Sequence, residues 1–343
     1  EISCSLVGSE MCIRDRCNAV YFSEWLKNDY PDIYHRLARI LNRHNVAYDI
    51  IPNTKDVWCR DYMPIQLDKE RYLCYEYKPD YLMNSASNRK YITDSLDICR
   101  DMQLKIKETP LIIDGGNVVK VGNKAIMTEK VFVENPTVNE NTLKNLLEEQ
   151  MECEIIFIPW DRAEKYGHSD GIIKPISDNS ILMTNYHDFD KEYSNEVINR
   201  LSNKFDIKIL SYNVPKTSPE SWAYINFLTV GNLIVLPALG KEEDEQALEQ
   251  INAYYPNYTI EQLNISDLVK DGGGLNCVSW CRYANEQETR YLKLYNILDY
   301  EDDSTRNRMF TDEEIIFMCK HNLRKFADKF PGIAEYYMKC LDD

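Results

Sequence analysis

The chain has 343 residues, a hydrophobic content of 44% and a net charge of −16. The hydrophobic content is ordinary for a globular protein with a substantial core, and no run reaches the roughly eighteen apolar residues of a membrane span. The acidic charge argues against duplex nucleic acid, which binds basic surfaces, so we expect neither a nucleic-acid nor a membrane partner.

Residues 1–16 (EISCSLVGSEMCIRDR) show no helical or strand periodicity and resemble a translated sequencing adapter. We interpret them as a non-native leader and expect the fold within residues 17–343. The eleven cysteines of the chain are odd in number and include no C-x-x-C pair. This pattern is typical of free thiols in a reducing compartment, so we expect a cytoplasmic protein without a disulfide framework.

A unit of hairpin, helix and strand recurs along the body of the chain. Turns of Asn with Gly or Asp, which accept positive φ, predict hairpins at 118–128, 172–184 and 227–237. Helices are predicted after the hairpins at 140–151, 191–204 and 242–254. Further strands are predicted at 154–159, 207–212 and 258–263. A looser first copy has a strand pair at 65–77, a helix near 93–102 and a strand at 111–114.

Polar clusters precede the hairpins at nearly equal intervals. With one marker residue in each cluster, the intervals are 53, 54, 58 and 51 residues. The markers are Asp61, Asp114, His168, Asn226 and Cys277. Because one such unit cannot bury its own faces, the even spacing predicts an α/β fold that closes as a five-bladed propeller around a central funnel.

No linker rich in Pro, Gly or Ser interrupts this body, so we expect a single domain. From about residue 286 the sequence predicts a helical tail that packs on the propeller. Thr311 and Glu314 form a capping-box pattern for a helix at 312–329, and Pro331-Gly332 ends it.

Cys277 follows three consecutive glycines, Gly272–Gly274, which permit a sharp turn and a close approach of ligand to the backbone. A thiol presented by such a loop is a candidate nucleophile. A lone cysteine is more often a core residue, and we interpret Cys281 in this way.

His168 lies in the segment GHSDG, two residues before Asp170. In an extended segment, residues i and i+2 point to the same side, so both side chains are expected to face one site. The other four histidines fall in predicted helices or a polar loop and are interpreted as structural. An H-x-D pair alone is a weak indication of function.

Asp61 lies in WCRDYMP, and Asp114 begins DGGN. Taken singly, Asp61 fits a surface ion pair with Arg60, Trp58 fits a core position, and Asp114 fits a turn cap. Their positions at the start of successive repeats favour a shared site instead.

Together these motifs resemble the agmatine deiminase and bacterial peptidylarginine deiminase family, within the guanidine-modifying superfamily. They are W-x-R-D at 58–61, D-G-G-N at 114–117, G-H-x-D at 167–170, Y-x-N-F at 224–227 and G-G-G-x-N-C at 272–277. The resemblance covers roughly residues 18–283. It implies a hydrolase that deiminates agmatine or a similar arginine derivative without a metal or other cofactor, and for agmatine it implies a role in polyamine (putrescine) biosynthesis.

The resemblance also implies roles for single residues. Cys277 stands at the position of the family's nucleophile, and His168 at that of its acid/base. Asp61 and Asp170 stand at the positions of the carboxylates that bind the guanidinium. In this family the thiolate attacks the guanidinium carbon, ammonia leaves, and water releases the ureido product from a covalent thioether.

Three further positions belong to the expected site. Asn226 matches an active-site position of the peptidylarginine branch, and Trp58 is expected to flank the aliphatic stem of the substrate. The family often has Glu where this chain has Asp114, which is one methylene shorter. Its role, orienting the histidine or touching the guanidinium, stays open.

Several alternatives stay open in the sequence: a peptidylarginine deiminase, an amidinotransferase on the same fold, and a guanidine-binding protein without catalysis. The complete set of site residues argues against the last. A papain-like peptidase would place its cysteine before its histidine, the reverse of the order here. The acidic body favours a small, doubly cationic guanidine such as agmatine, since residues 78–91 hold no close arginine pair for a carboxylate. The sequence does not indicate whether the chain forms a homo-oligomer.

Overall fold

The computed structural model describes residues 17–286, 288–290, 292–293 and 296. The chain divides after Asn285 into two compact units, and the five sheets described below lie in the first. The predicted leader at 1–16 and the predicted helix at 312–329 lie outside the described residues. Within the described ranges, no helix combines the length and apolar character needed to cross a membrane.

The first unit has an α/β fold built from five three-stranded sheets. In every sheet the central strand pairs antiparallel with one neighbour and parallel with the other. The strands of four sheets are β3 (Ile65–Gln66), β4 (Arg71–Glu76) and β5 (Lys105–Ile112); β6 (Val119–Val121), β7 (Lys124–Thr128) and β8 (Glu154–Ile158); β9 (Ile173–Ser177), β10 (Ser180–Met183) and β11 (Asp206–Ile209); and β12 (Leu228–Val230), β13 (Leu233–Ala238) and β14 (Thr259–Asn264).

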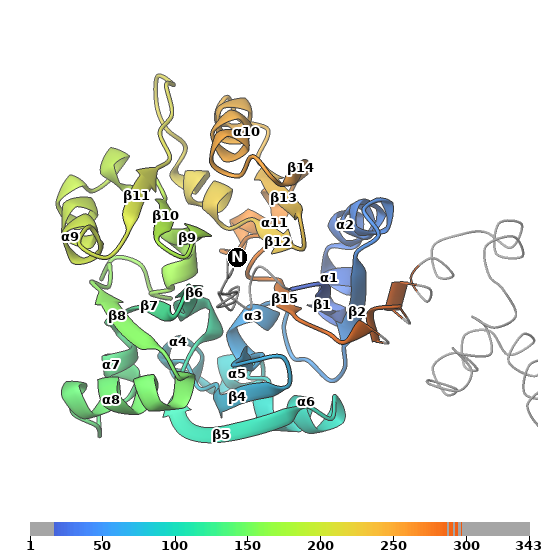
Figure 1. The fold of residues 1–343 in the computed structure, drawn as a ribbon, viewed down its shortest axis with the longest axis vertical. Coiled ribbons are helices and arrows are strands. Elements are labelled where there is room, and N and C mark those ends of the chain that lie inside the picture. The colour runs from blue at the N-terminus through green and yellow to red at the C-terminus, as the bar shows by residue number, and fades with distance from the viewer. Residues whose placement is uncertain (1–16, 287, 291, 294–295, 297–343) are drawn as a thin grey trace, which may run out of the picture. The chain divides into compact units, whose positions relative to one another are not determined.

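The fifth sheet joins the beginning and the end of this unit. Its central strand β1 (Ala19–Ser23) pairs antiparallel with β15 (Ser279–Arg282), with Ala19 opposite Arg282. The same strand pairs in parallel with β2 (Ala47–Ile51). Figure 1 shows the five sheets lying around a common centre. The hydrogen bonds of this sheet therefore tie the two ends of the unit together.

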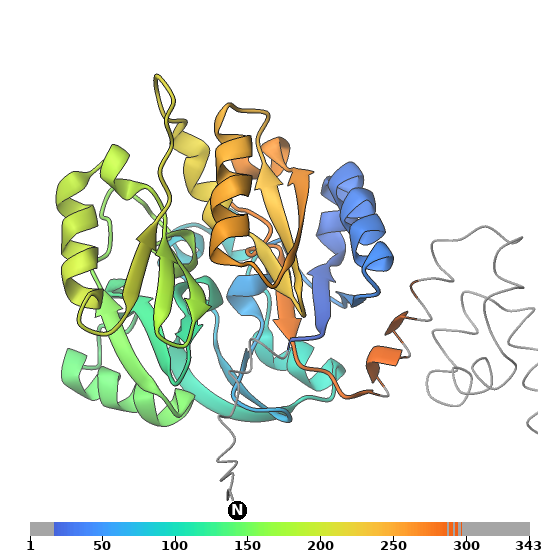
Figure 2. The same ribbon diagram turned by 45° about the horizontal axis from the view of Figure 1, so that its top comes forward.

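Helices connect the central strand of each sheet to its parallel partner, as a parallel connection requires a crossover. The longer ones lie at the periphery, outside the strands (Figures 1 and 2). They are α2 (Pro31–Arg43), α6 (Ser95–Asp101), α8 (Glu140–Met151), α9 (Lys191–Leu201) and α10 (Glu243–Tyr254). Shorter helices are α1 (Glu24–Asp29), α3 (Cys59–Tyr62), α4 (Asp80–Met83), α5 (Ala86–Arg89), α7 (Lys130–Glu134) and α11 (Ser266–Lys270).

The recurring unit of hairpin, helix and strand is confirmed from Ile65 onward, and the predicted helix at 140–151 has its expected bounds. The strand predicted at 111–114 was placed too late, because β5 begins at Lys105 and ends at Ile112. Its first residues are charged and largely exposed, yet they pair with β4 at the edge of their sheet. Backbone pairing at a sheet edge does not require apolar side chains, so the hydrophobic pattern missed this stretch.

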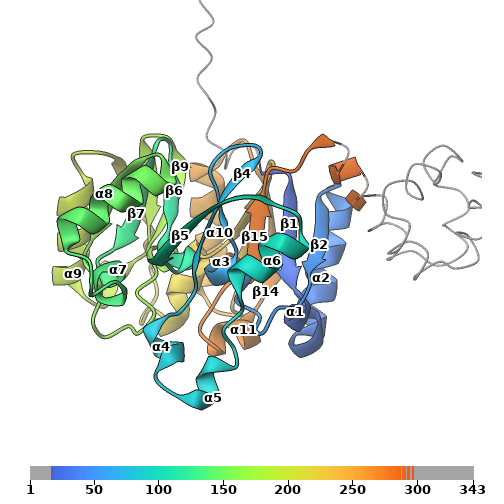
Figure 3. The same ribbon diagram turned by 90° about the horizontal axis from the view of Figure 1, so that it is seen from below.

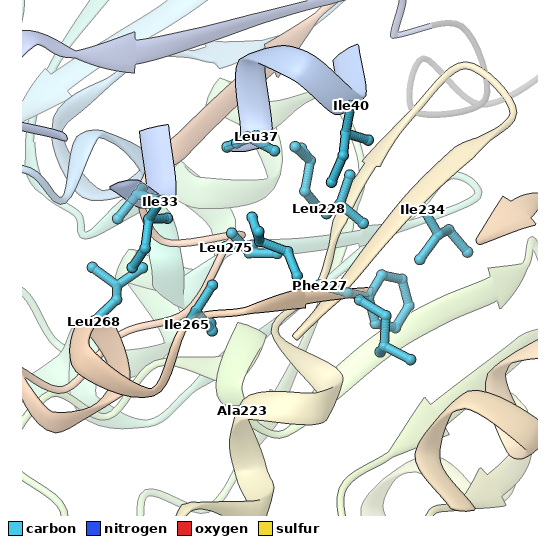
Figure 4. Close-up of a cluster of buried hydrophobic side chains, with 14 of the residues drawn as sticks. Ile33, Leu37, Ile40, Ala223, Phe227, Leu228, Ile234, Ile265, Leu268 and Leu275 are labelled. Atoms are coloured by element: carbon cyan, nitrogen blue, oxygen red, sulfur yellow. The ribbon is translucent and has the colours of Figure 1, made fainter. Parts of the chain in front are cut away.

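One face of α2 belongs to the main apolar core of the unit. Ile33, Leu37 and Ile40 recur at helical spacing and are buried, Leu37 completely. Figure 4 shows them in a cluster with Leu228 of β12 and Leu268 of α11. Leu275, in the loop before β15, belongs to the same cluster. The core therefore supports the glycine-rich segment that precedes β15.

Leu37→Ala should lower the free energy of unfolding by about 2–5 kcal/mol, because it leaves a cavity in a closely packed core. Urea denaturation would measure the loss. Leu146→Ala, on the half-buried face of α8, is the matched control and should cost clearly less. Equal losses for the two variants would contradict the placement of α2 against this core.

Candidate active site

A cavity of about 1060 Å³ opens among the loops that precede the hairpins. Its walls include side chains of the segments before β3, β9, β12 and β15, far apart in the sequence. The predicted site residues on the wall are Trp58, Asp61, His168, Asp170, Asn226 and Cys277. The structure thus gathers six of the seven predicted residues at one hollow. The seventh, Asp114, is buried next to His168 without lining it.

The glycine-rich loop before β15 owes its composition to its neighbours. A side chain at Gly273 would place its Cβ only 2.0 Å from the Trp58 ring, so glycine is the residue that fits there. The loop then brings Cys277 to the cavity with 9% of its surface exposed. Cys281, two residues into β15 and half-buried, does not line the cavity.

Asn226 fixes the backbone that carries the thiol. Its side-chain Oδ1 accepts hydrogen bonds from the backbone N–H groups of Asn276 at 3.1 Å and Cys277 at 3.2 Å. The same oxygen lies 3.3 Å from Cys277 Sγ. Asn226 is fully buried. One amide oxygen therefore sets both the path of the loop and the direction of the sulfur.

Asp170 also lies near the sulfur, with its Oδ2 at 4.0 Å from Cys277 Sγ. Asn276 Nδ2 donates to this oxygen at 2.7 Å, and Lys174 Nζ donates to Asn276 Oδ1 at 2.8 Å. Neither Asn276 nor Lys174 was predicted from the sequence as a site residue. Asn276 could have been found as the polar residue next to Cys277 in its motif, whereas Lys174 carries no such signal.

His168 is held between two carboxylates. Its Nε2 lies 3.0 Å from Asp114 Oδ2, and its Nδ1 lies 3.6 Å from Asp61 Oδ1. The expected extended segment around it is wrong, because Ser169–Gly171 form a 3₁₀ turn. The turn nevertheless leaves both His168 and Asp170 on the cavity wall. Despite its shorter side chain, Asp114 reaches the imidazole.

The D-G-G motif allows this approach. The backbone N–H of Gly116 donates to Asp61 Oδ1 at 3.1 Å. A Cβ at this glycine would lie 2.6 Å from both Asp61 Oδ1 and His168 Nδ1. Tyr81, which sequence reasoning missed, donates its hydroxyl to Asp114 Oδ2 at 3.2 Å. Backbone and phenol together orient the two carboxylates around the ring.

Asp61 is not part of a surface ion pair. It is only 6% exposed, and Arg60 instead donates its Nε to the backbone oxygen of Asn276 at 3.4 Å. Burial raises the pKa of Asp61 to about 7, with the charges of Asp114 and Asp170 adding to the rise and that of His168 opposing it. Asp61 is therefore harder to ionise than an exposed carboxyl.

The charges also set the states of the imidazole and the thiol. Burial acts to lower the pKa of His168, but Asp61, Asp114 and Asp170 more than offset it and hold that pKa well above its usual value. Burial raises the pKa of Cys277 well above its usual range, and Asp170 and Asp61 raise it further. Without a bound cation, the site therefore favours a protonated imidazole beside a neutral thiol.

A further carboxyl, Asp56, lies in the cavity wall and was not singled out from the sequence. Its Oδ1 accepts the backbone N–H of Trp58 at 3.0 Å. Burial, followed by the charge of Asp61, raises the pKa of Asp56 to about 8. Within the described parts of the chain, no group of three or more His, Cys, Asp or Glu side chains has an arrangement that could hold a metal ion.

Known proteins are similar to the chain in sequence and in fold. A curated relative from Mycoplasma capricolum subsp. capricolum, named "Putative agmatine deiminase", is 22% identical over 219 residues, 53% of this chain and 60% of the relative. One of the same name from Legionella pneumophila subsp. pneumophila is 24% identical over 264 residues, 69% of this chain and 74% of the relative. The chain thus spans less than two thirds of the first relative's length.

Among solved structures, the agmatine deiminase of Enterococcus faecalis superposes with a TM-score of 0.66 at 15% identity. The match covers 79% of this chain and 95% of that protein, and at this identity it shows a shared fold. The model of the Porphyromonas-type peptidyl-arginine deiminase family matches residues 28–281, well over half of the sequence and nearly all of the first unit. The chain therefore belongs to the Porphyromonas-type peptidyl-arginine deiminase family.

Proposed function

We propose that this protein is a cysteine-dependent guanidine deiminase, a hydrolase that converts a small guanidino substrate into a ureido product and ammonia. One observation carries the proposal: a thiol, a doubly paired imidazole and two carboxylates face the same cavity. These are Cys277, His168, Asp61 and Asp170. Family membership and the fold shared with an agmatine deiminase support the same reaction class.

We also infer that the five sheets are the blades of an α/β propeller whose central funnel is the active-site cavity. The repeated strand order and the joining of β1 with β15 support this closure. Each loop that carries a site residue then arises from a different blade. A cytoplasmic location stays a prediction from the scattered cysteines of the sequence.

The substrate guanidinium binds between Asp61 and Asp170. Its paired N–H donors match carboxylate oxygens, and its charge compensates the carboxylates that otherwise oppose a thiolate. Binding therefore lowers the pKa of Cys277 and drives the carboxyl of Asp61 into its charged form. The substrate itself thus activates the nucleophile: with the cation bound, the thiol of Cys277 releases its proton to water, while His168 keeps its own.

Cys277 Sγ attacks the central carbon of the guanidinium, and the resulting tetrahedral adduct loses one nitrogen as ammonia. His168 donates the proton that this leaving group needs, so an S–C bond forms and a C–N bond breaks. Asp114 and Asp61 keep the imidazole protonated until this step. The product of the first half-reaction is an amidino thioether on Cys277.

Water completes the reaction. His168, now neutral, removes a proton from a water molecule that attacks the thioether carbon. The C–S bond breaks, the ureido product leaves, and the thiol of Cys277 is restored. An amine in place of water would make the protein an amidinotransferase, which releases no ureido product.

Agmatine is the proposed substrate, because the cavity wall adds carboxylates beyond the guanidinium site. They are Asp29, Asp161, Glu164 and Asp271, and they outnumber the three lysines of the wall, Lys55, Lys90 and Lys165. A second positive charge on the substrate complements this wall, and Trp58 covers an aliphatic stem between the two charges. An assay for ureido products and ammonia with agmatine, arginine and arginyl peptides tests the choice. Turnover of arginyl peptides alone would assign the peptidylarginine activity instead.

Cys277→Ala should abolish turnover and leave the melting temperature nearly unchanged, since one small side chain at a cavity wall is removed. Cys281→Ala is the matched control and should keep most activity, because Cys281 does not line the cavity. Ammonia release at the parent rate from Cys277→Ala would exclude the thiol as nucleophile.

Asp61→Asn and Asp170→Asn keep the side-chain shape but remove the charge that pairs with the guanidinium. A hydrogen bond to a charged group contributes roughly 1.5–3 kcal/mol, so productive binding should weaken by about one to two orders of magnitude. At the same time iodoacetamide should alkylate Cys277 faster, because a neighbouring negative charge no longer raises its pKa. Normal substrate binding with unchanged alkylation would show that these carboxylates do not act on the thiol.

Asp56→Asn should stabilise the protein at alkaline pH. The folded state holds the proton of Asp56 up to about pH 8, whereas the unfolded chain releases it near pH 4. The contribution of Asp56 to the free energy of unfolding is therefore fully present below about pH 4 and is lost between pH 4 and 8. Relative to the parent, the free energy of unfolding of the variant should rise by up to about 1.4 kcal/mol per pH unit between pH 5 and 8. Melting curves across this range measure the gain, with the exposed Asp267→Asn as control. Parallel curves for all three proteins would contradict a protonated Asp56 in the folded state.

A further inference from the structure

Lys130 is a buried cation that the proposed reaction does not use. Its side chain is 1% exposed, at the start of α7. Its Nζ pairs with Asp80 Oδ1 and lies 3.6 Å from Glu134 Oε1. Burying a lysine is costly unless partners surround the ammonium, and here they come from another segment as well as its own helix.

Two aromatic rings complete the surroundings of the ammonium. Nζ lies 4.8 Å from the centroid of Trp160 and 5.7 Å from that of Tyr81. Both distances are within the range of cation–π attraction. Trp160 follows β8, whereas Tyr81 belongs to α4, so Lys130 contacts two segments that are separate in the sequence.

The first of these segments leads to the carboxylate behind the imidazole. Asp80 and Tyr81 begin α4, which with α5 projects at one end of the unit (Figure 3). Tyr81 donates to Asp114 Oδ2, the oxygen that also faces His168 Nε2. Pinning Asp80 therefore holds the phenol that orients this carboxylate.

The second segment leads directly to the imidazole. A Cβ at Gly167 would lie 2.8 Å from Lys130 Cδ and 2.9 Å from Trp160 Cδ1, so the lysine stem packs against the residue before His168. Thr128, two residues before Lys130, donates to the backbone oxygen of the same glycine. Lys130 thus also supports His168 directly, through the glycine that precedes it.

We propose that Lys130 is a positioning residue that holds His168 and Asp114 in register by pinning α4 and the 160–167 loop at once. The proposal rests on the acid/base role given to His168 above. Lys130 does not touch the substrate cavity itself, since it is not part of its wall. It acts through Tyr81 on Asp114 and through Gly167 on the ring.

Charge and position predict opposite changes when the lysine is removed. Losing a nearby cation, by itself, would raise the pKa of His168. Losing the alignment with Asp114 would lower that pKa, because this carboxylate helps to hold it up. The other groups that act on the ring are Asp61, Asp170 and Glu134, and Glu134 also pairs with Lys130. Glu134→Gln removes the charge of this glutamate and keeps Lys130, so a larger fall in the pKa of His168 in Lys130→Met than in Glu134→Gln indicates lost positioning.

Lys130→Met, which keeps the length of the stem, is the decisive variant. We expect the pKa of His168, followed by NMR titration of the substrate-free protein, to fall. We expect kcat for the preferred guanidine to drop by about tenfold or more, with KM changed much less, since misalignment affects the chemical step. Asp80→Asn, whose side chain is half exposed, should produce the same changes more weakly in a variant that folds readily.

Lys144→Met is the matched control, because Lys144 also pairs with a glutamate four residues later but lies on α8. It should leave both kcat and the His168 titration unchanged. A raised or unchanged pKa of His168 in Lys130→Met and Asp80→Asn would overturn the positioning role. The titration of His168 does not require turnover, so it can be measured even in an inactive protein. If the parent protein is inactive on every guanidine, the proposed reaction is refuted, but the titration still tests whether Lys130 positions His168.

Discussion

A buried imidazole placed between the carboxylates of Asp61 and Asp114 is the interaction on which the rest of the site depends. Burial alone would deprotonate the ring, and the two carboxylates reverse that outcome. Burial, with the charges of Asp170 and Asp61, raises the pKa of the nearby Cys277 and keeps its thiol protonated. The site thus favours a protonated imidazole beside a neutral thiol, and in the proposed reaction the cationic substrate shifts this balance toward a thiolate.

Such a concentration of acidic groups requires close backbone support. Gly116 donates a backbone N–H to Asp61, and the buried amide of Asn226 fixes the loop of Cys277. Glycines stand where side chains would collide with Trp58 or with the imidazole. These contacts cross between loops of different sheets, so the geometry of the site depends on how the sheets are joined. The pairing of β1 with β15 contributes directly, because β15 begins two residues after the thiol.

Buried charges extend behind the site as well as around it. Lys130 lies under the segments that carry His168 and Tyr81, and Lys174 supports Asn276 and through it Asp170. Burying each of these ammonium groups is unfavourable in isolation. Each ammonium instead holds polar partners in fixed positions through hydrogen bonds and ion pairs. This explains why lysine occupies positions where a core would otherwise hold apolar residues.

The sequence by itself determined the repeating unit, because hairpin turns and helical periodicity are local properties of Asn, Gly and apolar residues. It also determined the polar motifs that hold Cys277, His168, Asp61, Asp170, Asn226 and Trp58, since each motif lies just before a hairpin or, for Cys277, a strand. The start of β5 was not predicted, because its residues are mostly charged and its pairing with β4 depends on backbone hydrogen bonds to another strand. Only the tertiary structure decided that Asp114 faces the imidazole rather than the cavity, that Asn276 supports Asp170, and that Lys130 is buried. Distances between side chains from different sheets, and the pKa values that follow from them, exist only once the sheets are assembled.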